Sequence, residues 1–102
     1  MFEKVKYEMM ILLNEEFNDS ELKTWAFKYA KELQNLGGSE ISVISRGKRN
    51  LAYSINEQTK GNFIEMTFSM LPNNLEQFHK ILDFDDNVLR SLILRNTNLA
   101  IK

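Results

Sequence analysis

The 102 residues of the chain suffice for one domain that buries enough apolar surface to fold without disulfides or a structural metal. Hydrophobic residues at 43% and charged residues at 26% argue against a disordered or membrane-embedded chain, and the absence of cysteine excludes thiolate metal sites and thiol nucleophiles. A net charge of -1 and a pI near 5.8 argue against coating of nucleic acid by bulk charge, so contact with RNA requires clustered basic residues.

The first part of the sequence predicts a strand followed by a helix. Apolar residues alternate from Val5 to Leu13 as in the central strand of a sheet. Asn18 and Glu21 have the spacing of a capping box and predict a helix from Asn18 to Gly37, where Gly37 and Gly38 supply a left-handed stop. The helix residues expected to face the core are Leu22, Trp25, Ala26, Tyr29, Leu33 and Leu36.

Two further strands are predicted in the middle of the chain. The segment from Ile41 to Ile55 indicates the first of them, with Gly47 allowing a bulge, and the polar residues from Asn56 to Gly61 are expected to reverse the chain. In the strand that follows, the side chains alternate between a buried face and a second face. The four residues expected to be buried are Ile64, Met66, Phe68 and Met70.

A shorter helix and a last strand complete the pattern. Pro72 and Asn73 predict the start of the helix, the segment from Asp85 to Asn87 predicts a turn, and the last strand is expected from Val88 to Arg95. The tail from Asn96 to Lys102 lacks clear periodicity and is expected to fray. The buried stripe of the helix is expected to be Leu75, Phe78 and Leu82.

The order strand, helix, strand, strand, helix, strand predicts an α+β fold of ferredoxin-like type. In this fold (βαββαβ) four antiparallel strands form one sheet, and two helices cover one face of it. We expect a single domain over residues 1–96 and a flexible tail over residues 97–102. The other face of the sheet stays open, and partners commonly dock on that face or on its edges.

No catalytic residue, metal site or cofactor is predicted. His79 is the only imidazole, and spacing identifies no Ser, Asp or Glu partner for it, so a surface histidine is the better interpretation. Asp83, Asp85 and Asp86 lack the spacing and the turn glycine of a calcium loop and are better explained as turn residues. The glycine pair at 37–38 follows a helix, whereas a phosphate-binding loop precedes one.

The segment Arg46-Gly47-Lys48-Arg49 is the one cluster that suggests a binding function. Arginine bonds phosphates bidentately or stacks on bases, glycine lets the backbone approach closely, and the aromatic Tyr53 that follows offers a stacking surface. A short basic run taken alone is more often a solvated hairpin. RNA binding is therefore a hypothesis that needs support from the rest of the chain.

The surrounding residues supply that support, because the segment resembles the signature of the small ribosomal subunit protein six family. Gly-Lys-Arg, one further residue and Leu-Ala-Tyr run into a strand ending in Ile, as residues 47–55 do here. The resemblance extends in register over nearly the whole chain. Arg46, Asn50 and Ser54 depart from it, standing where the family often has Trp, Arg and Pro. The other matching residues are Tyr7, Glu8, Gly61, Phe63, Asp86, Asn87, Val88, Leu89, Arg90 and Arg95.

The resemblance implies a non-enzymatic structural protein of the small ribosomal subunit that binds the central domain of small-subunit ribosomal RNA. It also implies a heterodimer with small-subunit ribosomal protein eighteen, which would supply much of the positive charge and so explain the modest pI. No membrane and no small-molecule substrate is expected. The residues expected to contact RNA are Lys6, Tyr7, Arg46, Lys48, Arg49 and Arg90.

Two of these residues carry open alternatives. In the expected sheet the first and fourth strands neighbour the third, so Tyr7 and Arg90 are predicted to face the same surface. Core packing is the alternative role for Tyr7, and a surface ion pair with Asp86 is the alternative for Arg90.

The sequence also predicts a place of action, the ribosome of a bacterium or of a plastid. Residues near Met1 show neither an apolar run of signal-peptide length nor a transit-peptide composition, so we expect action in a bacterial cytoplasm or in the stroma of a plastid that encodes the protein.

Two other functions compete with ribosomal RNA binding. An acylphosphatase-like hydrolase of the same fold needs a phosphate-cradling loop near the first strand, where Asn14, Glu15 and Glu16 would repel phosphate. An RNA- or ligand-binding module outside the ribosome would be favoured by paired exposed aromatics on the central strands, for which Tyr7 and Phe63 are the candidates.

Overall fold

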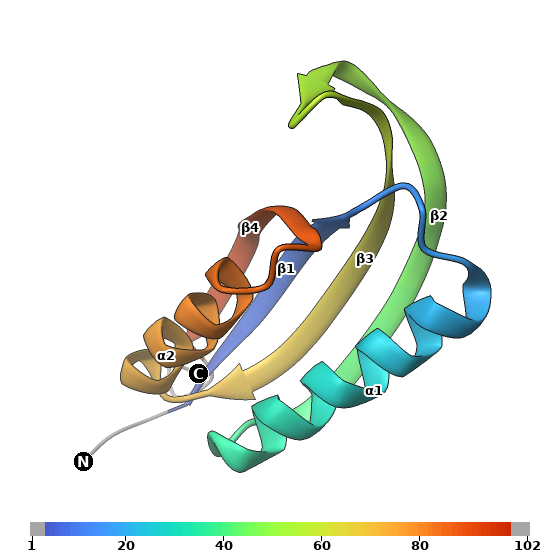
Figure 1. Ribbon diagram of the computed structural model, residues 1–102. Coiled ribbons are helices and arrows are strands. Elements are labelled where there is room, and N and C mark those ends of the chain that lie inside the picture. The colour runs from blue at the N-terminus through green and yellow to red at the C-terminus, as the bar shows by residue number, and fades with distance from the viewer. Residues whose placement is uncertain (1–3, 99–102) are drawn as a thin grey trace.

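The structure is a computed structural model that describes residues 4–98, with side chains described for residues 4–94. Its elements follow the predicted order and form one antiparallel sheet in the order β2-β3-β1-β4, with both helices on one face (Figure 1). The predicted ferredoxin-like α+β fold is therefore confirmed. The fourth strand lies beside β1 and not beside β3, which corrects the predicted neighbourhood. The elements are β1 (Val5–Leu13), α1 (Asp19–Asn35), β2 (Ser39–Ile55), β3 (Gln58–Met70), α2 (Pro72–Asp83) and β4 (Val88–Asn98).

Helix α1 begins and ends as the sequence predicts. The Asn18 side chain accepts a hydrogen bond from the backbone N–H of Glu21 at 2.8 Å, and the Glu21 carboxylate accepts one from the backbone N–H of Asn18 at 3.0 Å. At the other end Gly37 has a φ of 87°, and the N–H of Gly38 donates to the carbonyl oxygen of Leu33 at 2.7 Å. Both ends thus satisfy backbone groups that a helix leaves without partners.

Helix α2 begins at Pro72, as the sequence predicts. Pro72 occupies the first turn, the N-cap is Leu71, and no side chain caps the helix. Proline suits this position because its missing N–H would lack a partner there in any case. The next residue, Asn74, donates from its side chain to the carbonyl oxygen of Leu36 at 2.8 Å and so joins the start of α2 to the end of α1.

The β2–β3 turn is tighter, and the last strand longer, than the sequence predicts. Ile55 pairs with Gln58, so the turn consists of Asn56 and Glu57, with φ of 49° and 64°. Two positive φ values characterise the type I′ turn, whose twist matches that of a hairpin. At the other end of the chain β4 extends to Asn98, past the predicted end of the strand at Arg95. Residues 99–102 lie outside the described part.

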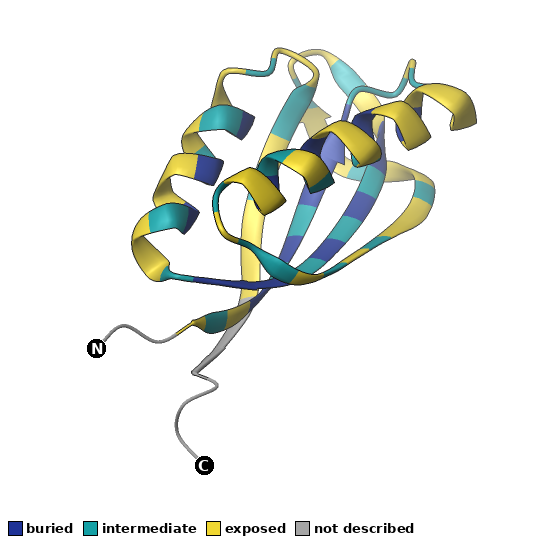
Figure 2. Cartoon of the chain, turned by 90° about the horizontal axis from the view of Figure 1, so that it is seen from below, coloured by how far each residue is buried: buried dark blue, intermediate teal, exposed yellow. Residues whose placement is uncertain are grey.

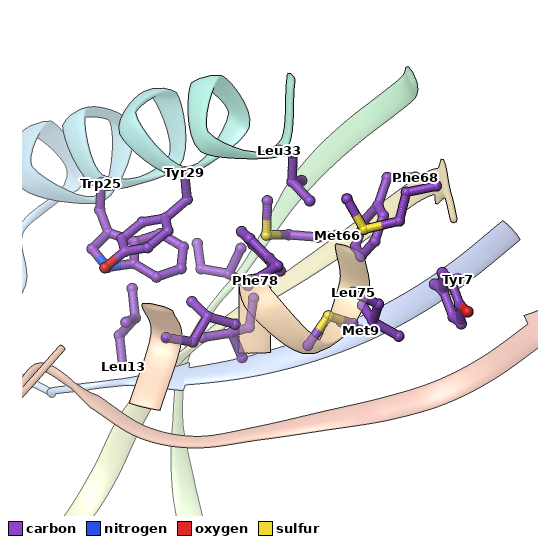
Figure 3. Packing of buried hydrophobic residues seen from close by; sticks show 14 of the residues in the cluster. Tyr7, Met9, Leu13, Trp25, Tyr29, Leu33, Met66, Phe68, Leu75 and Phe78 are labelled. Carbon is purple, nitrogen blue, oxygen red and sulfur yellow. The ribbon is translucent and has the colours of Figure 1, made fainter. Parts of the chain in front are cut away.

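The core lies between the sheet and the two helices. Figure 2 shows buried positions repeating along the inner sides of the helices and along the central strands, and Figure 3 shows how the side chains interlock. Phe68 of β3 and Phe78 of α2 meet edge to face with ring centroids 5.8 Å apart, and both are fully buried. The predicted buried residues of β3 and α2 are all in this cluster, so alternation and helical spacing predicted the core face correctly.

Candidate nucleic-acid interface

Strands β2 and β3 extend beyond the rest of the sheet as a two-stranded hairpin. Asn62, opposite Leu13, is the first residue of β3 that pairs with β1, and between the β2–β3 turn and Asn62 the strand β3 pairs only with β2. We call residues 49–61 the hairpin arm, which Figure 1 shows curving away from the four-stranded part of the sheet. The predicted basic segment therefore lies where four strands narrow to two.

Gly47 shapes the base of this arm. The pairing register shifts by one residue between Ser45 and Gly47, and Gly47 has a φ of 88°, so the predicted bulge is confirmed. A Cβ atom at this position would meet nothing within 4 Å, so glycine is required here by the backbone conformation and not by lack of space.

The bulge brings Arg46 and Arg49 together on one side of the strand. The Nε of Arg49 donates to the carbonyl oxygen of Arg46 at 3.3 Å, and Arg46 forms an ion pair with Glu65 at 2.9 Å between Nη2 and Oε1. Both arginines line one hollow with Met10 and Phe63. Since Met10 and Phe63 belong to the strand positions that face away from the helices, the two guanidinium groups lie over the open face of the sheet.

The open face carries apolar side chains in its middle and cations at both edges. One row across the sheet consists of Gly47, Phe63, Leu12 and Arg90, which are paired from strand to strand in the order β2-β3-β1-β4. Four strands span about 14 Å from edge to edge at the usual spacing. Arg90 at one edge and the arginines of β2 at the other therefore flank an apolar strip.

The apolar strip is formed by Met10, Leu12, Phe63 and Leu92. Met10 and Phe63 are half-buried on the central strands. Leu92, which pairs with Met10, is 56% exposed. Leu12 is buried although it belongs to the open face, because it packs against Gly61, where a Cβ atom would approach its Cδ1 atom to 2.4 Å. The strip is thus a surface on which an apolar partner can pack.

The other predicted contact residues lie apart from this row. Lys48 is exposed and pairs with Asn62, and strand alternation directs it to the side opposite from Arg49. Lys6 is exposed and pairs with Ser69 on the open face, but it lies roughly 20 Å along β1 from Leu12 at the usual rise per residue.

Tyr7 lies in the core. It is 5% exposed and packs against Phe68 with ring centroids 5.9 Å apart, and burial raises the pKa of its hydroxyl (Figure 3). Arg90, by contrast, lies on the open face. The prediction that Tyr7 and Arg90 face the same surface is therefore wrong, because residues of odd number in β1 all point toward the helices.

The sequence did not reveal the role of Asp85. One carboxylate oxygen of Asp85 accepts hydrogen bonds from Trp25 Nε1 at 3.1 Å and from the Tyr29 hydroxyl at 2.7 Å, and the other accepts from the N–H of Asn87 at 2.9 Å. Burial opposes ionisation, but these bonds and the nearby Lys28 outweigh it and hold the pKa of Asp85 below its ordinary value. Trp25 and Tyr29 lie one turn apart on α1, and a buried indole N–H or phenol O–H usually has an acceptor, so the pair indicated that acceptors lie nearby but not which residue supplies them.

His79 also has a partner that spacing did not identify. Its Nε2 lies 2.8 Å from the hydroxyl oxygen of Ser91 on β4. Within residues 4–94, no group of three or more His, Asp or Glu side chains is placed to hold a metal ion. The helices described here include none that is both long and apolar enough to cross a membrane.

A split βαβ sheet with an open face, basic residues at the base of the hairpin arm and an apolar strip defines a binding domain. The family model for ribosomal protein S6 matches residues 6–95, and the chain belongs to that family. It is a protein of the small ribosomal subunit, of bacterial or plastid type, and not an enzyme. The predicted family is therefore confirmed, and the hydrolase alternative is wrong.

Individual relatives agree with this assignment. The chain is 70% identical to small ribosomal subunit protein bS6c of Trieres chinensis over 87% of this chain and 93% of the relative. It is 59% identical to the bS6c protein of Phaeodactylum tricornutum, over 86% and 90%, and 34% identical to the bS6 protein of Dictyoglomus turgidum, over 86% and 91%. The crystal structure of 30S ribosomal protein S6 from Thermotoga maritima has the same fold, with a TM-score of 0.81 at 20% identity over 90% of this chain and 87% of that one.

Proposed function

We propose that the chain binds the central domain of small-subunit ribosomal RNA together with small-subunit ribosomal protein eighteen. The observation that carries this proposal is the row across the open face, with arginines at both edges and apolar side chains between them. Cations separated by an apolar strip suit a surface that receives phosphates at its margins and a protein partner in its middle.

The RNA contacts are assigned to Arg46, Lys48, Arg49 and Arg90, with Lys6 as a more distant contact. Arg46 already bonds Glu65, which holds its guanidinium group in place, and this pair is exposed enough for a phosphate to compete for the arginine. We leave Tyr7 out of the contacts because its ring is buried in the core.

The partner is assigned to the apolar strip. Leu92 is more than half exposed on an edge strand, a position where a monomeric protein gains little from leucine. The net charge of -1 also favours an RNA interface shared with a basic partner protein. Each phosphate that is neutralised adds separately to the affinity for RNA, so the partner can supply the cations that this chain lacks. The two plastid-type relatives at 70% and 59% identity favour a plastid ribosome as the place of action.

The RNA contacts are tested by filter binding of a central-domain RNA fragment over a salt series, with the partner protein present. Replacing Arg46, Lys48 and Arg49 by Ala should flatten the slope of log affinity against log salt by roughly 0.7 to 0.9 for each phosphate that is no longer neutralised. The matched control replaces the exposed helix lysines Lys23, Lys31 and Lys80, which removes the same charge from the two helices. Equal effects of the two triple variants would contradict the assigned contacts.

The partner surface is tested by calorimetry with the eighteenth protein. Leu92→Glu places a carboxylate in the apolar strip. Because the position is exposed, the variant should keep its fold, and its affinity for the partner protein should fall by roughly tenfold or more. Phe27→Glu on the outer side of α1, where Phe27 is 64% exposed, is the control and should leave the affinity unchanged. Unchanged affinity of Leu92→Glu would place the partner elsewhere, and tight RNA binding without any partner would contradict the heterodimer.

A further inference from the structure

A groove lies on the helix side of the molecule, away from the open face of the sheet. It has a volume of about 760 Å³ and runs between α1 and the end of α2 with the turn that leads to β4. Its walls include Thr24 and Lys28 on one side and Ile81 and Phe84 on the other. It is larger than the hollow beside Arg46 and takes no part in the proposed RNA interface.

The floor of the groove is held together by a ring contact and hydrogen bonds. The rings of Trp25 and Tyr29 lie 4.3 Å apart between centroids, and both polar tips donate to Asp85 (Figure 3 shows the pair). Asp85 is in turn fixed by the backbone of Asn87. A floor held by hydrogen bonds costs little conformational entropy when a ligand settles on it.

The wall of the groove offers a large apolar side chain to solvent. Phe84, which follows α2, is 87% exposed, the highest value among the large exposed hydrophobic residues of the described chain. It stands next to Ile81, which is only half-buried. An exposed aromatic ring at the rim of a groove is the kind of residue that contributes most to binding a peptide.

The charges around the groove select its occupant. One ammonium group, that of Lys28, stands against four carboxylates, and Lys28 also lies 5.4 Å from the centre of the Tyr29 ring. The capping box uses Glu21 and the aromatic pair uses Asp85, which leaves Glu32 and Asp86 at the rim for a ligand. The carboxylates are Glu21, Glu32, Asp85 and Asp86. Phosphates would be repelled here, whereas arginine and lysine side chains would be attracted.

We propose that this groove binds a basic peptide segment of another protein, with an apolar residue of the segment against Phe84 and its cations at Glu32 and Asp86. The proposal is independent of the RNA interface, which lies on the other face of the sheet. Extended basic segments are the complementary partner because they supply both cations and intervening apolar side chains.

The chain carries its own probe for this site. Trp25 is the single tryptophan and lies in the groove, so its fluorescence reports on occupancy. A short peptide of alternating arginine and leucine should produce a saturable change in Trp25 fluorescence, and its affinity should fall with added salt. A peptide of alternating glutamate and leucine should produce none, and one of arginine and serine should bind roughly tenfold or more weakly.

Variants with matched controls separate the groove from general attraction. Phe84→Ser and Asp86→Asn should each lower the affinity for the arginine-leucine peptide, the first by roughly tenfold and the second by roughly two- to fivefold. Phe27→Ser and Glu76→Gln remove an exposed aromatic ring and a carboxylate outside the groove, and both should bind as the unmodified chain does.

Three results would overturn the proposal. The first is an equal fall of affinity in Phe84→Ser and Phe27→Ser, which would show attraction without a site. The second is an RNA oligonucleotide that changes Trp25 fluorescence in competition with the peptide. The third is concentration-dependent self-association in sedimentation that Phe84→Ser abolishes, which would make a second copy of the chain the occupant.

Discussion

The two faces of one sheet differ in what completes them. On the side of the helices, Met9, Ile11 and Leu13 of β1 are fully buried by the chain itself. On the other side, Met10 of the same strand stays half-buried, and its neighbour Leu92 is mostly exposed. Alternate residues of one strand therefore serve two purposes: one set stabilises the fold, and the other leaves apolar surface, at Met10 and beside it at Leu92, for the proposed partner.

The largest expected effect comes from removing a ring on the covered face. Phe68→Ala should lower the free energy of unfolding by about 3–5 kcal/mol, because Phe68 is fully buried between the sheet and Phe78. Urea denaturation followed by far-UV circular dichroism measures the change.

The matched variant on the open face is Leu92→Ala on β4. Because Leu92 is more than half exposed, its truncation should lower the free energy of unfolding by less than half as much as Phe68→Ala does. It should also lower the affinity for the proposed protein partner. Equal destabilisation by both variants would show that the open face is part of the core in the isolated chain.

The next effect concerns the hydrogen bond beneath the groove. Tyr29→Phe removes the donor to Asp85 and should cost about 1.5–3 kcal/mol of stability near neutral pH, since the acceptor is charged. Because the pKa of Asp85 is lowered in the folded chain from its ordinary value of 3.8, its stabilising effect is full above that value and is lost as pH falls through the folded pKa.

The difference in free energy of unfolding between the native chain and Tyr29→Phe should therefore be constant above about pH 5 and shrink below about pH 4. Denaturation curves across this range measure it. A difference that stays constant down to about pH 2 would mean that packing of the ring, and not the ionised carboxylate, sets the cost.

A smaller effect is expected at the base of the arm. Gly47→Ala should cost about 1–2 kcal/mol, because alanine strains a backbone with φ of 88° even where space is free. It should weaken RNA binding as well, since the bulge positions Arg46 and Arg49. Gly37→Ala is the control: its φ of 87° predicts a similar fall in stability, but it lies at the end of α1 and should leave RNA affinity unchanged.

The smallest effect tests the competition for Arg46. Glu65→Gln removes the acidic partner at 2.9 Å and should change stability by less than about 1 kcal/mol, as exposed ion pairs contribute little. RNA affinity should rise by roughly two- to threefold at low salt and return to the native value at high salt. A fall in affinity would mean that RNA binds Arg46 in the position where Glu65 holds it and does not compete with Glu65 for it.

Sequence patterns predicted the covered face because burial imposes a period on each element. The burial of Tyr7 follows from the same alternation, since it shares the parity of Met9 and Ile11. Its assignment to RNA came from the resemblance, which aligns positions along the chain but carries no information on where a side chain points.

Contacts between distant segments could not be predicted in this way. Trp25 and Asp85 are 60 residues apart, and only the packing of α1 against the turn after α2 brings them together. The Arg46–Glu65 pair depends on the register of β2 with β3, which a bulge shifts by one residue. The sequence predicts too long a turn at Asn56 and Glu57, because glutamate rarely adopts positive φ and the polar run to Gly61 has the composition of a loop.

The pairing of β1 with β4 has a consequence for synthesis of the chain. Val5 lies opposite Asn98, so the first strand obtains its second neighbour only after nearly all of the described residues have left the ribosome. Until then the edge of β1 exposes unpaired backbone groups. A ribosomal protein of this topology therefore completes its sheet in one late step, and a nascent chain stalled before β4 would offer β1 as a site for aggregation or for a chaperone.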